Sequence, residues 1–534
     1  MFNVSPLRCF LAASLLLGTA LTAFAGTAIG YRNDGSGVYP EEKPVTTFDD
    51  AKGTNILWKT PLPNYGSGCP IVVKDRVYVV CDATMAEALP ALLCYDINTG
   101  KLLWKQEVNH LNEFPAEEAA TARKQWLETR DYEAKRNVLF NKAREMTDKT
   151  GAEYAAIFTE LKALGVAEKD MYDGTPEKKP RTTVDTRIGD GPAINALRGN
   201  LLKKYNLYFN TWQRWGSMNF GDSLPTPASD GENIYVEDAY NVVACYSAQD
   251  GAKKWVRIFT DSNSKKGLSW PGRNYFTSSP VLVGDVLVLS LGGYYRGIDK
   301  ATGKSLWQFS GDPGGGEYRA DTPRALHLGN IDVVIMPDRS VVRVSDGKVL
   351  ATNIIGHNGP ADMLIDGSTV ISTTKEGLAA VTLTLDTPDT VTAKPLWTNT
   401  DTKDQRGNVS PVLQGGIVYS KGEQYTYVID VLTGKTVTKV SYSINMGGLV
   451  IGGDYLFALD ENGNVGVLKT GRDAKLVSKN VLLVDPAVGA KAEKCIRQSS
   501  GRGWNFTRSQ PTFSGDKIII RSNDNLYCIG EKAK

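Results

Sequence analysis

The stretch from Ile298 to Trp307 reads Ile-Asp-Lys-Ala-Thr-Gly-Lys-Ser-Leu-Trp and predicts two strands joined by a tight turn. Asp299 favours the turn because its carboxylate can accept hydrogen bonds from the backbone that follows it. Gly303 favours it because glycine adopts positive φ angles without a steric cost. Trp307 ends the second strand with a large apolar ring whose N–H needs a partner when it is buried.

This pattern recurs along the chain. Residues 95–104 and 246–255 are close copies, 429–437 keeps the turn without tryptophan, 344–350 is a shortened copy, and Trp397 ends a copy with a longer turn. The closing tryptophans are 52 residues apart from Trp255 to Trp307 and 90 apart from Trp307 to Trp397, which is two units of about 45. A period of this length in β-rich sequence is typical of a β-propeller with one blade per repeat.

Trp58 has the position of a blade-closing tryptophan, although no blade precedes it. We therefore expect the N-terminal strand to complete the last blade by pairing with strands at 517–521 and 525–530, which removes free sheet edges. The closing turns after Trp58 number eight: Gly100, Gly251, Gly303, Gly347, the longer turn before Trp397, Gly434, Gly471 and Gly530. The sequence predicts an all-β fold, an eight-bladed propeller of four-stranded antiparallel blades. Seven blades stay possible because the last two turns are weaker copies.

Residues 1–25 have the features of a secretory signal peptide. Arg8 is followed by an apolar run at 10–21 and by the small-x-small site Ala23-Phe24-Ala25. The apolar run is too short to span a bilayer, so no transmembrane segment is expected. Cys9 precedes the run and is not placed to become a lipidated first residue. We expect an exported protein, periplasmic or extracellular, whose propeller occupies residues 26–534.

A helical insertion at 106–205 is expected to interrupt the propeller between two blades. Residues 116–148 are rich in Ala, Glu, Lys and Arg, and 152–164 and 194–205 are two further helical candidates. The favoured interpretation is a hairpin packed against the side of the propeller. A lid over the channel and a docking arm for another protein are the alternatives.

Composition limits the classes of partner. The chain is 41% hydrophobic and 22% charged, as in ordinary globular proteins, and its formal net charge of +2 falls to +1 when the signal containing Arg8 is removed. A nucleic acid or an anionic membrane is therefore not expected as a general partner. Zinc is not expected either, because His110, His327 and His357 are the only histidines and no ligand pair has finger spacing.

The Asp-x-x-Thr-Gly-Lys-x-x-Trp turns, together with Asn-Asp-Gly-Ser-Gly-Val-Tyr-Pro at 33–40, resemble the PQQ-like β-propeller repeat family. That family includes quinoprotein alcohol dehydrogenases and the propeller lipoprotein of the bacterial outer-membrane barrel-assembly machinery. The chain looks closer to non-catalytic members such as that lipoprotein. The resemblance implies that the repeat tryptophans are structural wedges between blades: Trp58, Trp104, Trp255, Trp307 and Trp397.

The dehydrogenase branch of the family implies a quinone held with Ca²⁺, a catalytic Asp and usually a disulfide between adjacent cysteines. The cysteines after the signal are Cys69, Cys81, Cys94, Cys245, Cys495 and Cys528. No two are adjacent, and no Cys-x-x-Cys-His motif is present for haem attachment. No catalytic residue, metal ligand or cofactor is therefore predicted, and pyrroloquinoline quinone with Ca²⁺ belongs to an alternative interpretation only. Cys81 and Cys94 could form a disulfide across one hairpin or be buried thiols.

Loops before the innermost strands carry charged and aromatic residues that could meet at the channel mouth. The candidates are Trp270, Arg273, Arg319, Asp321, His357, Asp362, Asp404, Arg406, Arg502 and Trp504. Arginines and aromatic rings gathered in one place suit an anionic or sugar-like ligand. For each residue alone, a solvated or paired loop charge is the simpler interpretation.

The hypothesis that follows is an exported propeller that serves as a binding or assembly scaffold, with a protein partner or a small anionic or sugar-like ligand. A quinone-dependent dehydrogenase with a divergent site and a carbohydrate-active propeller are the alternatives.

Overall fold

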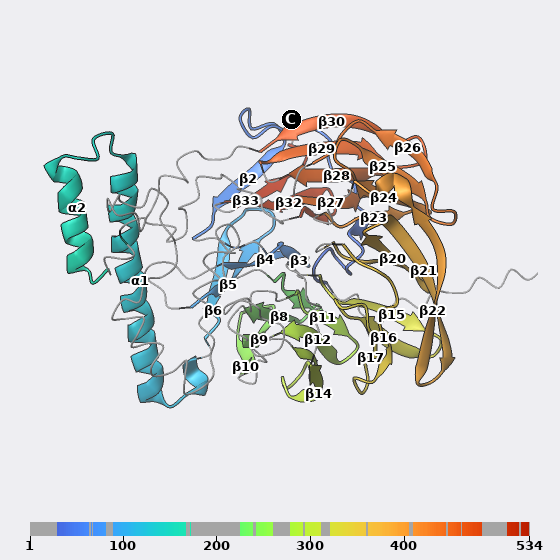
Figure 1. Cartoon of the computed structure of the whole chain (residues 1–534), viewed down its shortest axis with the longest axis horizontal. Helices are drawn as coiled ribbons and strands as arrows, with labels where there is room; N and C mark the ends of the chain where they lie inside the picture. Colours follow the sequence, from blue (N-terminus) through green and yellow to red (C-terminus); the bar gives the residue numbers. More distant parts are fainter. Residues whose placement is uncertain are drawn as a thin grey trace, which may run out of the picture.

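The computed structural model describes residues 29–63, 66, 68–81, 89–109, 111–166, 171, 225–238, 242–259, 278–291, 294–310, 321–358, 361–404, 409–444, 447–460, 462–482, 510–522 and 525–532. Their strands form eight separate sheets arranged as blades around a centre (Figure 1). The eight-bladed propeller is confirmed, and the seven-bladed alternative is excluded. The predicted signal peptide and the helix predicted at 194–205 lie outside the described residues.

Blades are numbered here by the order of their inner strands. Blade 1 contains β3 (Ile71–Val73), β4 (Arg76–Cys81), β5 (Ala91–Asp96) and β6 (Leu102–Glu107). Blade 2 contains β7 (Ala228–Ser229), β8 (Asn233–Asp238), β9 (Val242–Ser247) and β10 (Lys253–Ile258). Blade 3 contains β11 (Val281–Val283), β12 (Val286–Leu291), β13 (Tyr294–Asp299) and β14 (Ser305–Ser310). Blade 4 contains β15 (Arg324–Leu328), β16 (Ile331–Ile335), β17 (Val341–Arg343) and β18 (Val349–Ala351).

The second half of the chain repeats this order. Blade 5 contains β19 (Leu364–Asp366), β20 (Thr369–Thr374), β21 (Gly377–Thr387) and β22 (Thr390–Asn399), followed by the short helix η3 (Thr400–Thr402). Blade 6 contains β23 (Val412–Gln414), β24 (Ile417–Lys421), β25 (Thr426–Asp430) and β26 (Thr436–Val440). Blade 7 contains β27 (Gly447–Gly452), β28 (Tyr455–Asp460), β29 (Asn464–Lys469) and β30 (Lys475–Val481).

Blade 8 closes the ring with strands from both ends of the chain. Its inner three strands are β31 (Thr512–Ser514), β32 (Lys517–Arg521) and β33 (Asn525–Ile529), and its outer strand is β2 (Ile56–Pro61). Trp58 lies opposite Cys528 in this pairing. The predicted closure by the N-terminal strand is thereby confirmed. A second N-terminal strand was not predicted: β1 (Val38–Tyr39) pairs in parallel with β27 and gives blade 7 five strands.

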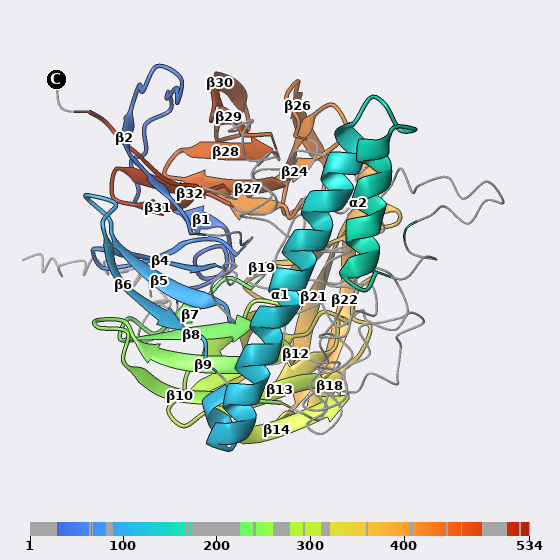
Figure 2. The ribbon, with the colours of Figure 1, turned by 90° about the vertical axis from the view of Figure 1, so that its left-hand side faces the viewer.

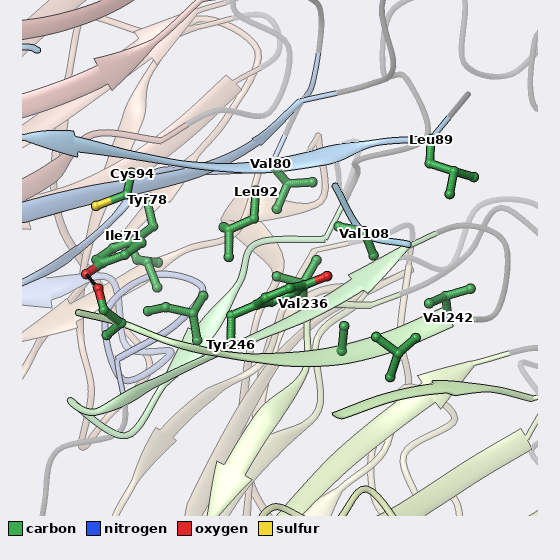
Figure 3. Close-up of a cluster of buried hydrophobic side chains, with 14 of the residues drawn as sticks. Ile71, Tyr78, Val80, Leu89, Leu92, Cys94, Val108, Val236, Val242 and Tyr246 are labelled. Carbon is green, nitrogen blue, oxygen red and sulfur yellow. Dashed lines mark hydrogen bonds between the residues drawn. The ribbon is translucent and has the colours of Figure 1, made fainter. Parts of the chain in front are cut away.

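The cores lie between neighbouring blades, where the alternating apolar faces of two sheets meet. Between blades 1 and 2, Tyr78 and Leu92 of the first sheet face Val236 and Tyr246 of the second (Figure 3). Comparable buried clusters fill the other boundaries. Each blade therefore depends on both neighbours to bury its two faces.

The helices of the insertion lie outside the ring, beside β6 (Figures 1 and 2). After η1 (Leu111–Glu113), α1 (Ala116–Glu145) and α2 (Ala152–Ala163) form an antiparallel hairpin. Asp148 caps the connection, because its Oδ1 accepts hydrogen bonds from the backbone N–H groups of Thr150 and Gly151. No helix in the described part of the chain is long and apolar enough to cross a membrane.

The hairpin has its own apolar core and a charged attachment to blade 1. Its core contains Tyr132, Phe140, Ile157, Phe158 and Leu161, among others. Near the start of α1, the Arg123 guanidinium donates two hydrogen bonds to the Glu107 carboxylate on β6, at 2.8 and 2.7 Å. The outer part of the hairpin is thus stabilised independently of the propeller. Since β6 continues to Glu107, the first residues of the range predicted for the insertion belong to the blade.

Candidate functional site

The repeat tryptophan of one blade packs on the closing turn of the next. Trp255 donates its indole N–H to the carbonyl oxygen of Lys300 at 3.0 Å, and its ring covers Gly303. Gly303 has φ +68°, and a Cβ built there would lie 2.6 Å from the Trp255 ring. The turn therefore requires glycine both for its conformation and for space. Asp299 completes the turn by accepting hydrogen bonds from the backbone N–H and the hydroxyl of Thr302.

The same arrangement is found at three more boundaries. The indole donors and their carbonyl acceptors are Trp58 with Ile97 at 2.9 Å, Trp307 with Val344 at 2.8 Å and Trp397 with Val431 at 2.8 Å. The glycines under these rings are Gly100, Gly347 and Gly434. These tryptophans connect neighbouring blades through one hydrogen bond and through the packing of the ring on a turn glycine.

The boundary between blades 1 and 2 differs. Trp104 covers Gly251 in the usual way, but its Nε1 is buried and has no hydrogen-bond partner among the residues that the structure describes. The carbonyl oxygen in the equivalent position, that of Ala248, accepts instead from the Tyr78 hydroxyl at 2.7 Å. The Tyr78 and Trp104 ring centroids are 5.8 Å apart, and Figure 3 shows Tyr78 between the two blades. Tyrosine has therefore replaced tryptophan as the donor across this boundary.

At the centre of the propeller, most of the residues that precede the inner strands are hydrogen-bonded to the equivalent residue of a neighbouring blade. We call this set the inner ring. Its members in the described part of the chain are Cys69, Thr226, Ser279, Thr322, Asp362, Ser410 and Gln510. All but Asp362 are followed directly by proline, which cannot extend the hydrogen bonding of the strand backward.

The inner ring is linked by backbone N–H groups that donate to the side chain of the next blade. Gln510 donates to the Cys69 sulfur at 3.3 Å, Cys69 to the Thr226 hydroxyl at 2.9 Å, and Thr226 to the Ser279 hydroxyl at 3.0 Å. On the other side, Thr322 donates to Asp362 Oδ1 at 2.8 Å, and Asp362 to the Ser410 hydroxyl at 3.0 Å. These bonds satisfy backbone N–H groups that take no part in the pairing of the strands.

Blade 7 contributes no side-chain acceptor to the inner ring, because the residue at the equivalent position is Gly448. The Gln510 side chain lies against Gly448, where a Cβ would overlap it. Arg32 bridges the interruption from above the ring residues: its Nη2 donates to the Pro411 carbonyl oxygen at 2.6 Å, and its Nη1 donates to Gln510 Oε1 at 3.3 Å. A guanidinium from the N-terminal segment thus connects blades 6 and 8.

Residues 29–39, called here the crossing segment, run from one side of the ring to the other. Ile29 pairs with Ser229 in blade 2, and Val38 pairs with Ile451 in blade 7. Between them, the Tyr31 hydroxyl accepts a hydrogen bond from Gln510 Nε2 at 3.0 Å. The chain's own N-terminal segment therefore occupies the middle of this end of the propeller.

Two buried carboxylates at this end are used in structural contacts. Asp321 Oδ2 accepts from Arg339 Nη1 at 2.9 Å, and both side chains are essentially inaccessible, at 0% and 1% exposed. Asp362 accepts from Thr322 through one oxygen and from the Ser410 hydroxyl through the other, at 2.7 Å. Asp321 and Asp362, both predicted as ligand residues, thus lie at the centre of the propeller, where they connect neighbouring segments of the chain.

Burial controls the ionisation of the groups at this end. Desolvation raises the pKa of Tyr31, with the Asp362 carboxylate adding to the effect, so Tyr31 is a neutral hydrogen-bonding group near pH 7. Desolvation also raises the pKa of the Cys69 thiol. A thiol held in its neutral form is a poor nucleophile, which fits the role of Cys69 as an acceptor in the inner ring.

The structure describes only some of the remaining predicted channel residues. Trp270, Arg273, Arg319, Arg406, Arg502 and Trp504 lie outside the described residues, so their gathering at the channel mouth stays a prediction. His357 is partly buried in the connection before β19. Asp404 accepts hydrogen bonds from the Glu423 backbone and the Tyr427 hydroxyl, beside blade 6. The important residues that sequence reasoning missed are Arg32, Arg324 and Arg339.

Cys69, Cys81, Cys94, Cys245 and Cys528 are buried free thiols. Cys81 and Cys94 do not face each other, because Cys81 pairs with Ala91 and Cys94 with Tyr78 in the β4–β5 hairpin. Within the described ranges, no group of three His, Cys, Asp or Glu side chains could hold a metal ion. The expectation about cofactors stays a prediction.

A sequence comparison matches residues 210–359 to the family described as outer membrane protein assembly factor BamB. No curated protein matches the chain in sequence. Among solved structures, BamB from Moraxella catarrhalis is 14% identical, with a TM-score of 0.39 over 56% of this chain and 82% of that one.

Quinohemoprotein alcohol dehydrogenases are also among the similar structures. The enzyme ADHIIG from Pseudomonas putida HK5 is 12% identical, with a TM-score of 0.45 over 92% of this chain and 79% of its own. The enzyme from Comamonas testosteroni is 11% identical, with a TM-score of 0.46 over 95% and 81%. The chain carries a BamB-like PQQ repeat, as its turns predict.

Proposed function

We propose that the protein is an exported, non-catalytic scaffold that binds or helps to assemble other proteins. The observation that supports the proposal is that the polar side chains at the centre of the propeller make structural contacts. Asp321, Asp362, Arg32 and Arg339 all make contacts that hold blades or the crossing segment in place. Groups committed to the frame in this way favour a rigid platform over a site that must bind and release a substrate.

The α1–α2 hairpin supports the proposal as a surface for a partner. The ring is closed by β2 and β33 without it, and its outer part has an apolar core of its own. A projecting element with this independence can present side chains to another protein while the propeller stays unchanged. We therefore place the partner contact on the hairpin.

Photocrosslinking in the native host tests this directly. A crosslinking amino acid would replace Val138 on α1, which is 49% exposed, and in a control Leu306 on β14, which is 52% exposed. We expect a discrete adduct from position 138 and none of that size from position 306. Equal patterns from the two positions would contradict a docking role for the hairpin.

A second assay addresses the alternative enzyme. The purified protein would be incubated with pyrroloquinoline quinone and Ca²⁺ and tested for dye-linked alcohol oxidation. We expect neither a Ca²⁺-dependent rise in thermal stability nor activity. Saturable quinone binding with alcohol oxidation would overturn the scaffold proposal in favour of a dehydrogenase.

A further inference from the structure

Arg324, the first residue of β15, has an unusual environment for a buried arginine. The residue is only 6% exposed, and its Nε is enclosed without a hydrogen-bond partner. Its guanidinium makes no hydrogen bond or ion pair with any residue that the structure describes. Arg32, Arg339 and Arg521, which are buried at the same end, each donate to carbonyl oxygens. Burying a guanidinium without such partners is costly, so a counter-ion is expected there.

The guanidinium of Arg324 lies against the crossing segment. It lies against Gly35, which has φ +93°, and a Cβ on Gly35 would overlap Nη1 of Arg324. The Arg32 guanidinium lies in the same way against Gly37, which has φ +76°. Two guanidiniums are therefore seated on two glycines of one short loop. Any larger residue at 35 would cover the Arg324 head.

The charges around these two guanidiniums do not balance within the interior. Asp362 is a buried carboxylate whose charge acts on Arg324, and its two oxygens already accept from Thr322 and Ser410. Asp34 is exposed and accepts from the backbone N–H of Ser36. Tyr31 is neutral, because burial raises its pKa. Among the residues that the structure describes, neither guanidinium is thus bonded to a negative group.

The charges that act on Arg324 point to the same lack of a bonded negative group. Desolvation lowers the pKa of Arg324, the Asp362 and Asp34 carboxylates raise it, and the Arg32 charge lowers it further. A bound anion would oppose the two lowering effects at once. Its size must be small, because so little of the Arg324 side chain is accessible.

We propose that Arg324 and the crossing segment form a binding site for a small oxyanion, either a carboxylate or a phosphate, at the centre of the propeller. The planar guanidinium offers two parallel N–H donors that match the oxygens of either group. The site goes beyond the scaffold function, since it needs no protein partner. Occupation of the site would also fix the crossing segment against blade 4.

The test is a set of thermal unfolding curves of the mature protein in sodium acetate, sodium phosphate and sodium chloride at equal ionic strength. We expect acetate or phosphate to raise the midpoint above that in chloride, with a rise that saturates as the concentration increases. The salt that acts identifies the oxyanion as a carboxylate or a phosphate. The rise should be lost in Arg324→Gln and kept in the control Arg343→Gln, which removes a guanidinium that binds Asp346 and Asp389 on the surface.

Equal responses of the wild type and Arg324→Gln, or no response of the wild type to either oxyanion, would overturn the proposal. If Arg324→Gln does not fold, Gly35→Ala provides the second variant. It keeps the charge but places a methyl group on the Arg324 head, and it should weaken the response to the oxyanion relative to chloride. An unchanged response in a folded Gly35→Ala protein would equally contradict the site.

Discussion

The hydroxyl of Tyr78 donates to the carbonyl oxygen of Ala248 at 2.7 Å and so takes the acceptor that an indole N–H uses at four other blade boundaries. Trp104 keeps its packing on the turn glycine, but its N–H has no acceptor in the described part of the chain. The repeat thus combines two separable contributions, burial of a ring and one hydrogen bond across the boundary. Comparing substitutions of Trp104 and Trp307 can separate the contribution of the hydrogen bond from that of ring burial.

Replacing tryptophan by phenylalanine should therefore be more costly at 307 than at 104. Both variants lose ring area, but only Trp307→Phe leaves the Val344 carbonyl without its donor. A buried acceptor left unsatisfied costs about 1–3 kcal/mol. We expect the denaturant midpoint to fall further for Trp307→Phe by an amount in this range. Equal losses for the two variants would mean that the hydrogen bond contributes nothing.

Gly303→Ala should destabilise the protein more than Gly284→Ala in the same blade. Both glycines have positive φ angles, +68° and +59°, so both substitutions carry the strain of a left-handed alanine, about 1–2 kcal/mol. At Gly284 nothing lies within 4 Å of the new Cβ, whereas at Gly303 it meets the Trp255 ring at 2.6 Å. The difference between the two unfolding midpoints measures this contact. Similar midpoints would show that the ring shifts without cost.

These contacts explain which part of the fold can be predicted from sequence. In the repeats at 95–104, 246–255 and 298–307, the turn Asp, the turn Gly and the closing Trp lie within ten residues of one another, so the local sequence is enough to recognise them. The long β21–β22 hairpin hides the copy that ends at Trp397, yet its tryptophan still marks the blade.

The inner ring and the crossing segment could not be predicted in this way. Cys69 and Thr226 are joined only because two blades are adjacent, and Arg32 reaches Pro411 across most of the sequence. The residue before each inner-strand proline was a signal for the ring, but nothing local shows that its backbone N–H reaches the next blade. The Asp321–Arg339 pair could not be predicted either, because a loop acid looks the same in sequence whether it binds a ligand or an arginine.

Breaking the Asp321–Arg339 pair should have a large effect on stability. Arg339→Met leaves the Asp321 carboxylate buried without its ionic partner, which typically costs about 3–5 kcal/mol. The double variant Asp321→Asn with Arg339→Met should recover part of this loss, because the buried charge is gone. Denaturant unfolding of Asp321→Asn, Arg339→Met and the double variant, each compared with the wild type, checks the order. A double variant that is as unstable as the sum of both single changes would indicate that the pair is not coupled.

Asp430 predicts an acid-sensitive contact between blades 6 and 7. Its Oδ2 accepts from Arg472 Nη1 at 2.6 Å, and this bond, with those from Thr433, lowers its pKa from 3.8 to about 2. A lowered folded-state pKa stabilises the fold above the unfolded-state pKa, and this stability is lost as the pH falls from about 4 to about 2. Arg472→Gln should raise the pKa of Asp430 and reduce stability at pH 6. The difference from wild type should disappear near pH 2, and a difference that persists there would contradict the assignment.

The pairing of β2 with β33 also determines when the molecule can become complete during synthesis. The outer strand of blade 8 is translated long before its partner, because β2 ends at Pro61 and β33 begins at Asn525. At about 5–20 residues per second, the ribosome needs roughly 25 to 90 s to make the sequence between them. Throughout that interval the edge of β2 has no partner to pair with. During synthesis, the nascent chain therefore carries β2 without its partner strand until β33 has been made.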